Sequence, residues 1–98
     1  MKAFRIEPEV YDDLADAADW YDSKEPDLGD RFLDFAQSLI RAVAERPDSF
    51  PSVGGQVRVA HAKPFPYKVY FHATNDSVKV FAVLHGARRP GSWRARLR

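Results

Sequence analysis

The sequence predicts an α+β domain in which an antiparallel helical hairpin packs on one face of a small, mainly antiparallel β-sheet. Residues 8–46 contain two segments with apolar side chains at helical spacing, whereas residues 57–84 contain runs rich in β-branched and aromatic side chains. The expected order is strand, helix, helix, strand, strand, strand. Two successive helices between strands favour the α+β class, because both helices then pack on one face of the sheet.

The first half of the chain supplies a short strand and both helices. Residues 1–7 alternate apolar and charged side chains, and Pro8 ends that strand and suits the first turn of a helix. We expect one amphipathic helix over 8–23 and a second over 30–46, joined by the segment 24–29 with its proline and glycine. A connection this short makes the helices antiparallel. The aspartates on the outer face of the first helix are expected to be solvated.

The second half supplies the rest of the sheet. Residues 56–62 are a strand candidate. The runs 67–73 and 78–84 flank the polar turn 74–77, and together they predict a β-hairpin. The run 78–84 is apolar on both faces, so we expect it to be central in the sheet. His85 follows this run directly, and Arg88 and Arg89 come three and four residues later. These side chains lie at the point where a buried strand reaches solvent. Any chemistry or partner binding is expected near that point.

Aromatic side chains at helical spacing usually pack in a core. We therefore expect Trp20, Phe32 and Phe35 to contribute to packing rather than to a ligand site. Trp93 is large for a chain end, and it could close an edge of the core, stack on a base or anchor another protein. The first of these is favoured for a single tryptophan.

Composition limits the class of protein. A chain of 98 residues can bury one core, so we expect one domain over 1–98, with 91–98 as a flexible basic tail that orders when a partner binds. No apolar run is long enough to span a membrane, and the N-terminus lacks the apolar stretch of a secretory signal. Cysteine is absent, which excludes disulfides and thiolate chemistry. The expected location is the cytoplasm.

Charge is divided unevenly along the chain. Residues 1–48 hold 6 basic and 13 acidic side chains, a net charge of −7, whereas residues 49–98 hold 9 basic and 1 acidic, a net charge of +8. Such a split can produce a basic face that attracts phosphates or an acidic protein partner. Equally, the acidic helices and the basic sheet can neutralise each other inside the fold.

Few kinds of chemistry fit these residues. The histidines His61, His72 and His85 lie on separate predicted strands and without ligand spacing, so no metal site and no cofactor are expected. A phosphate-cradling glycine loop and a nucleophile elbow are also missing from the sequence. Metal-independent RNA cleavage is more permissive, because it needs only a base, an acid and cations around the phosphate.

Five side chains at one end of the sheet could supply such a set, namely Lys63, Lys68, His85, Arg88 and Arg89. The alternative is ordinary solvated charge for the cations and a hydrogen-bonded strand-end imidazole for His85. Taken one residue at a time, the alternative is favoured.

Eleven short segments, in their order and spacing, resemble a known family. They are FRIEP at 4–8, DL at 13–14, WY at 20–21, LGDRF at 28–32, Pro47, FP at 50–51, VR at 57–58, FPYKVYF at 65–71, VLHGARRP at 83–90, Trp93 and Arg96. Together they cover nearly the whole chain and resemble the RelE/ParE superfamily of bacterial type II toxins, often called plasmid stabilization proteins.

This resemblance implies a small growth-inhibiting toxin that is neutralised by an antitoxin encoded beside it. A disordered segment of the antitoxin would fold over the toxin, as helix or strand along the helical hairpin and the sheet. RelE-like members cut messenger RNA in the ribosomal A site without a metal. ParE-like members inhibit DNA gyrase and are not known to be catalysts.

The residues match a nuclease only in part. RelE-like enzymes place an arginine in the first hairpin strand, where this chain has Lys68, and a second arginine after the next strand, matched by Arg88. Their C-terminal tyrosine corresponds to no tyrosine here, because the nearest aromatic residue is Trp93. Lysine lacks the planar fork of arginine, and indole has no ionisable hydroxyl.

The resemblance therefore favours a ParE-like toxin that acts on DNA gyrase and is not an enzyme. If it is a ribosome-dependent endoribonuclease instead, the catalytic residues would be Lys68, His85 and Arg88. An inactive relative that only binds antitoxin is the third alternative. The residues expected to contact a target or nucleic acid are Arg58, Lys63, Arg89, Trp93, Arg94 and Arg96.

Overall fold

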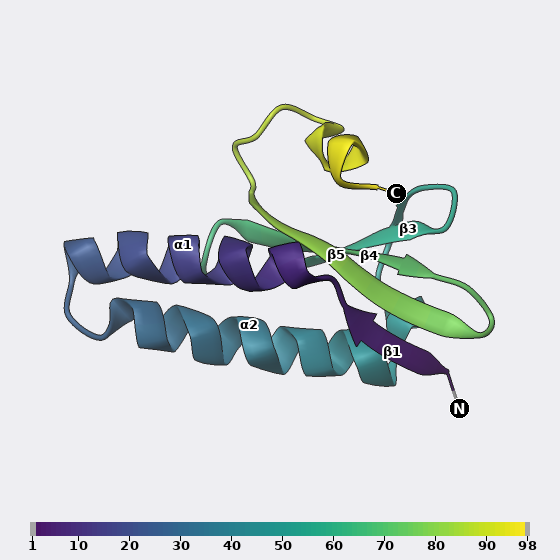
Figure 1. Cartoon of the computed structure of the whole chain (residues 1–98), viewed down its shortest axis with the longest axis horizontal. Coiled ribbons are helices and arrows are strands. Elements are labelled where there is room, and N and C mark those ends of the chain that lie inside the picture. The colour runs from purple at the N-terminus through teal and green to yellow at the C-terminus, as the bar shows by residue number, and fades with distance from the viewer. Residues whose placement is uncertain (1, 98) are drawn as a thin grey trace.

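The computed structural model describes residues 2–97 and confirms the α+β class (Figure 1). The strands are β1 (Ala3–Ile6), β2 (Ser52–Gly54), β3 (Val57–His61), β4 (Tyr67–Ala73) and β5 (Ser77–His85). The helices are α1 (Pro8–Lys24) and α2 (Leu28–Glu45), with short 3-10 helices η1 (Pro47–Ser49) and η2 (Ser92–Arg96). All predicted elements are present, and β2 is one strand more than the sequence analysis expected.

The five strands form one sheet in the order β1-β5-β4-β3-β2. β1 is parallel to β5, and the other neighbours are antiparallel. β5 therefore has a strand on each side, which confirms its predicted central position. The two helices lie side by side against one face of the sheet, and η2 lies over the other (Figure 1).

A bulge in β5 explains why this strand is apolar on both faces. Phe81 has no direct partner on β4, because the register shifts by one residue at that point. Val80 and Val83 consequently face the helices, whereas Phe81, Ala82 and Leu84 belong to a second hydrophobic cluster on the opposite face. β5 thus contributes to two cores at once.

The two helices approach closely at their connection. Asp22 of α1 accepts a hydrogen bond from the Gly29 backbone N–H at 2.8 Å, so a side chain of one helix satisfies a free donor at the start of the other. Gly29 is buried, and a Cβ there would overlap the backbone carbonyl oxygen of Ala18. Only glycine fits this contact. Asp22 itself remains exposed, so this hydrogen bond is consistent with the expected solvation of the outer aspartates of α1.

The prediction of a flexible tail over 91–98 is wrong for residues 91–97, and residue 98 lies outside the described part of the chain. Trp93 is 6% exposed and stacks on Tyr70 with ring centroids 6.1 Å apart, which fixes η2 on the sheet. Burial of this one aromatic side chain anchors a segment that looks too polar to be ordered. Trp93 therefore closes an edge of the core, as favoured from the sequence.

Two other aromatic residues differ from expectation. Trp20 is 56% exposed and Phe35 is 46% exposed, although both sit on amphipathic helices. Phe32, in contrast, is fully buried as predicted.

Over residues 2–97, neither helix combines the length and apolar character needed to cross a membrane.

Substitution of Gly29 by alanine tests the helix contact. Because backbone cannot move aside as a flexible side chain can, we expect Gly29→Ala to lower the free energy of unfolding by about 2 kcal/mol or more in denaturant titrations. Gly55→Ala is the control, since a Cβ there meets nothing within 4 Å. The control replaces glycine at a left-handed backbone position, φ +54°, which should lower the free energy of unfolding by about 1 kcal/mol. Equal losses in the two variants would contradict the close-contact interpretation.

Candidate functional site

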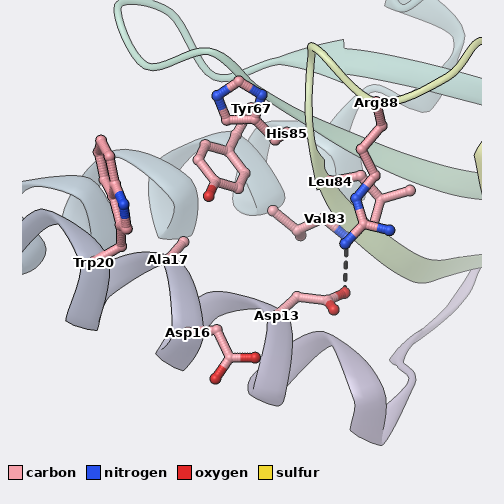
Figure 2. Close-up of a pocket in the computed structure, with 9 residues that line it drawn as sticks. All are labelled: Asp13, Asp16, Ala17, Trp20, Tyr67, Val83, Leu84, His85 and Arg88. Atoms are coloured by element: carbon pink, nitrogen blue, oxygen red, sulfur yellow. Dashed lines mark hydrogen bonds between the residues drawn. The ribbon is translucent and has the colours of Figure 1, made fainter.

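The site lies where β5 runs past the end of its neighbour β1. The last pair between these strands is Ile6 with Val80, so the following part of β5 has no strand on that side. Asp13 of α1 fills the gap, because its Oδ2 accepts a hydrogen bond from the Val83 backbone N–H at 3.0 Å (Figure 2). A helix side chain thus replaces the missing strand as hydrogen-bond partner.

Asp13 also binds Arg96 of η2. The two guanidinium nitrogens lie 3.1 Å and 3.0 Å from Asp13 Oδ1 and Oδ2, a bidentate pair. The side chains of Arg96 and Asp13 are 23% and 17% exposed, so the pair is largely shielded from water. One carboxylate therefore joins α1, β5 and the C-terminal segment, and the predicted solvation of this aspartate is wrong.

A cleft of about 420 Å³ opens beside this carboxylate, between α1 and the end of β5 (Figure 2). Its lining residues come from α1, β4, β5 and the loop that follows β5: Asp13, Asp16, Ala17, Trp20, Tyr67, Val83, Leu84, His85 and Arg88. The cleft combines carboxylates, an imidazole, a guanidinium, a phenol and an exposed indole. Within residues 2–97 no three potential metal ligands converge.

His85 has a defined hydrogen-bonding role at the edge of the cleft. Its Nδ1 accepts a hydrogen bond from the Ala87 backbone N–H at 2.9 Å, which places the proton of the neutral ring on Nε2. The ring also packs edge-on against Tyr67, with centroids 5.2 Å apart. In this state His85 offers the Nε2–H group as a donor, because its acceptor Nδ1 is already bound to the Ala87 N–H.

Tyr67 presents a neutral hydroxyl to the cleft. Burial raises the pKa of this phenol above its usual value of 10.0, and the negative charge of Asp16 adds to the rise, while Arg88 opposes it. Tyr67 is therefore protonated at physiological pH and can donate as well as accept a hydrogen bond.

The three residues of the alternative catalytic set do not lie together. His85 and Arg88 line the same cleft. Lys68 lies between Tyr67 and Val69, which both pack against the helical side, so its side chain points to the opposite face of the sheet. The structure thus places two members in one cleft, whereas Lys68 lies outside it and reaches toward Gly86 from the other face, where a Cβ at Gly86 would lie 3.7 Å from Lys68 Cε.

The residues expected to bind a target are also dispersed. Lys63 and Arg89 are exposed on loops at the cleft end of the sheet. Arg58 donates a hydrogen bond to the Phe50 carbonyl and lines a separate hollow beside the 74–77 turn. Arg94 lies over the Trp93 ring, 4.5 Å from its centroid. Trp93 stacks on Tyr70 and Arg96 pairs with Asp13, so both hold η2 in place.

Four residues of the cleft were missed from the sequence as site candidates, namely Asp13, Asp16, Trp20 and Tyr67. A signal was available for three of them. Asp13, Asp16 and Trp20 follow at i, i+3 and i+7, which places them on one face of α1. In the sequence, an indole on the same stripe as two carboxylates indicates a helix face that borders a cleft rather than the core.

Fold and site together define a small type II toxin of the superfamily that the sequence resembles. The family model described as "ParE toxin of type II toxin-antitoxin system, parDE" matches residues 4–90, and the chain belongs to this family. The match excludes only the first three residues and the segment that contains η2. The resemblance found in the sequence is thereby confirmed.

Known relatives agree with this assignment. The chain is 27% identical over 97 residues to the protein named Toxin ParE2 in two Mycobacterium tuberculosis strains, CDC 1551 / Oshkosh and ATCC 25618 / H37Rv, covering 98% of this chain and 92% of each relative. A solved structure titled "Chromosomal ParDE TA system from P. aeruginosa" contains a chain with the same fold, at a TM-score of 0.76 and 13% identity over 87% of this chain and 96% of that one.

Alkaline unfolding tests the buried phenols. Burial raises the pKa of Tyr21, Tyr67 and Tyr70 above 10.0, so the unfolded chain releases these protons at lower pH than the folded protein does. The unfolded state then binds fewer protons, and the free energy of unfolding falls as pH rises through and above about 10. We expect Tyr70→Phe to make this fall shallower in denaturant titrations across the alkaline range.

Tyr11→Phe, which removes a phenol that is 59% exposed, serves as the control. If Tyr70→Phe and Tyr11→Phe follow the same alkaline curve as the original protein, burial of Tyr70 does not contribute to the pH dependence.

Proposed function

We propose that this toxin arrests bacterial growth by inhibiting DNA gyrase in the cytoplasm, and that an antitoxin encoded beside it neutralises it. Membership of the ParE family supports the toxin role. The observation that favours gyrase over RNA is the separation of Lys68 from the cleft that holds His85 and Arg88.

Metal-independent cleavage of RNA would make strict demands on this cleft. A base must take the proton of the 2′-hydroxyl while cations hold the phosphate. Here the free nitrogen of His85 carries a proton, and its acceptor nitrogen is occupied by the Ala87 N–H. Of the described cations, only Arg88 lines the cleft, where Asp16 adds a negative charge and Asp13 is already paired with Arg96. These features suit a binding site better than a nuclease centre.

The loop after β5 suits contact with an anionic surface. Arg88 and Arg89 are both exposed, and Lys63 is exposed on the other loop at this end of the sheet. A guanidinium binds carboxylates and phosphates in a planar, two-pronged geometry. We infer that these cations and the cleft beside them contact the target.

The helical layer suits the antitoxin. Exposed Trp20 and Phe35 provide apolar anchors, and a groove of about 350 Å³ between α1 and α2 has a largely apolar lining that includes Leu14, Leu33 and Ile40. Partner segments with apolar side chains at helical spacing fit such grooves. The groove shares no lining residue with the cleft, whereas Trp20 lines the cleft together with Arg88, so the antitoxin surface borders the arginine loop.

Purified gyrase tests the proposal directly. We expect the toxin to inhibit DNA supercoiling, and Arg88→Ala to inhibit at least about tenfold less because a charge-assisted contact is worth roughly 1.5–3 kcal/mol. Pre-mixing with the antitoxin should restore supercoiling. Unaltered supercoiling at a large excess of folded toxin would remove gyrase as the target.

A ribosome-dependent endoribonuclease is the second candidate, because His85, Arg88 and the hydroxyl of Tyr67 do share one cleft. It predicts new 5′ ends inside translated messages after a short pulse of expression, and their loss in Arg88→Ala. Precursor labelling over the first minutes separates the two, since protein synthesis falls first for a nuclease and DNA synthesis for a gyrase inhibitor. If no synthesis falls, either the host lacks a target that the toxin recognises or the chain is an inactive relative that binds antitoxin.

A further inference from the structure

Asp13 has two arginines within its reach. Arg96 takes both of its oxygens, at 3.1 Å and 3.0 Å. Arg88 lines the same cleft as Asp13, and its side chain extends from the loop after β5 toward that carboxylate (Figure 2). Within residues 2–97 Arg88 makes no salt bridge. The choice between the two arginines therefore decides which guanidinium remains available in the cleft.

We propose that Arg96 is a positioning residue for Arg88. By occupying both oxygens of Asp13, Arg96 keeps Arg88 unpaired and ready for an anionic group of the target. The inference rests on the proposed function in one respect only, that Arg88 contacts the target.

The geometry favours Arg96 as the partner of Asp13. A bidentate pair uses both carboxylate oxygens and both outer nitrogens, and such charge-assisted bonds are roughly twice as strong as neutral ones. Oδ2 also accepts from the Val83 N–H, so the carboxylate is held in one orientation. If Arg96 is removed, a poorly solvated carboxylate is left without its cation, and the nearby Arg88 becomes the natural replacement.

The fold does not depend on Arg96 alone. Trp93 holds η2 on the sheet through Tyr70 and Phe81. The other end of the connecting loop is fixed by the Gly86 N–H, which donates to the Pro66 carbonyl at 2.6 Å. A variant without the Arg96 guanidinium can therefore keep its C-terminal segment in place while the pairing at Asp13 changes.

A pair of variants tests the proposal by rescue. We expect Arg96→Ala to need about tenfold more toxin for the same growth inhibition, as loss of one charge-assisted contact implies. Adding Asp13→Asn to Arg96→Ala removes the charge that captures Arg88 but keeps an oxygen acceptor for Val83. The double variant should recover most of the lost activity. Arg96 with a merely structural role predicts no recovery, and a double variant as weak as Arg96→Ala, or weaker, overturns the proposal.

Arg94→Ala is the matched control, because it removes one positive charge from the same short helix and leaves the Asp13 pair intact. It should lose less activity than Arg96→Ala. An equal loss would attribute the effect to net charge and contradict the positioning role. Thermal melts of all variants establish that each is folded.

A second measurement does not depend on the target. The Arg88 side-chain Nε–Hε resonance is expected to shift and to exchange more slowly with water in Arg96→Ala, and to return toward its original position in the double variant. A resonance unchanged by Arg96→Ala overturns the proposal even if growth inhibition falls. If gyrase is unaffected by the original protein but this resonance behaves as stated, the gyrase proposal alone fails.

Discussion

The structure depends on how the free part of the β5 edge is satisfied. β1 is only four residues long and pairs with β5 only as far as Val80. Beyond Val80, the backbone donors on that edge of β5 would therefore face solvent or an apolar helix. An unpaired buried N–H costs as much as a lost hydrogen bond. The Asp13 carboxylate solves this by accepting from Val83, and Arg96 then supplies the charge that a poorly solvated carboxylate needs.

The uneven charge along the sequence is used partly inside the fold. Asp13 and Glu7 of the acidic half pair with Arg96 and Lys79 of the basic half, respectively. Neutralisation between halves is therefore real but local. Among the described residues, Arg88 and Arg89 of the loop after β5 form no ion pair, so both remain available beside the cleft. This division explains how one chain can hold an acidic helical layer and still offer a basic binding surface.

The cleft is organised more for recognition than for proton transfer. His85 is held as a donor by Ala87, Tyr67 is kept neutral by burial, and Lys68 lies on the other face of the sheet. Anionic side chains or phosphates can meet Arg88 there, while the exposed Trp20 offers an apolar surface. A binding role needs only this complementarity, whereas catalysis would need an available base at a fixed distance from the cation.

The sequence by itself determined the α+β class, both helices, the central position of β5 and the end of the sheet where His85 and Arg88 meet solvent. These follow from periodicity and turn chemistry, which are local properties of the chain. Only the tertiary structure decided that Trp20 is exposed, that Trp93 anchors an ordered C-terminal segment, and that Lys68 and His85 lie on opposite faces. It also decided that Asp13 pairs with Arg96, 83 residues away along the chain. Such facts depend on the β5 bulge and on contacts between distant segments, which no local pattern encodes.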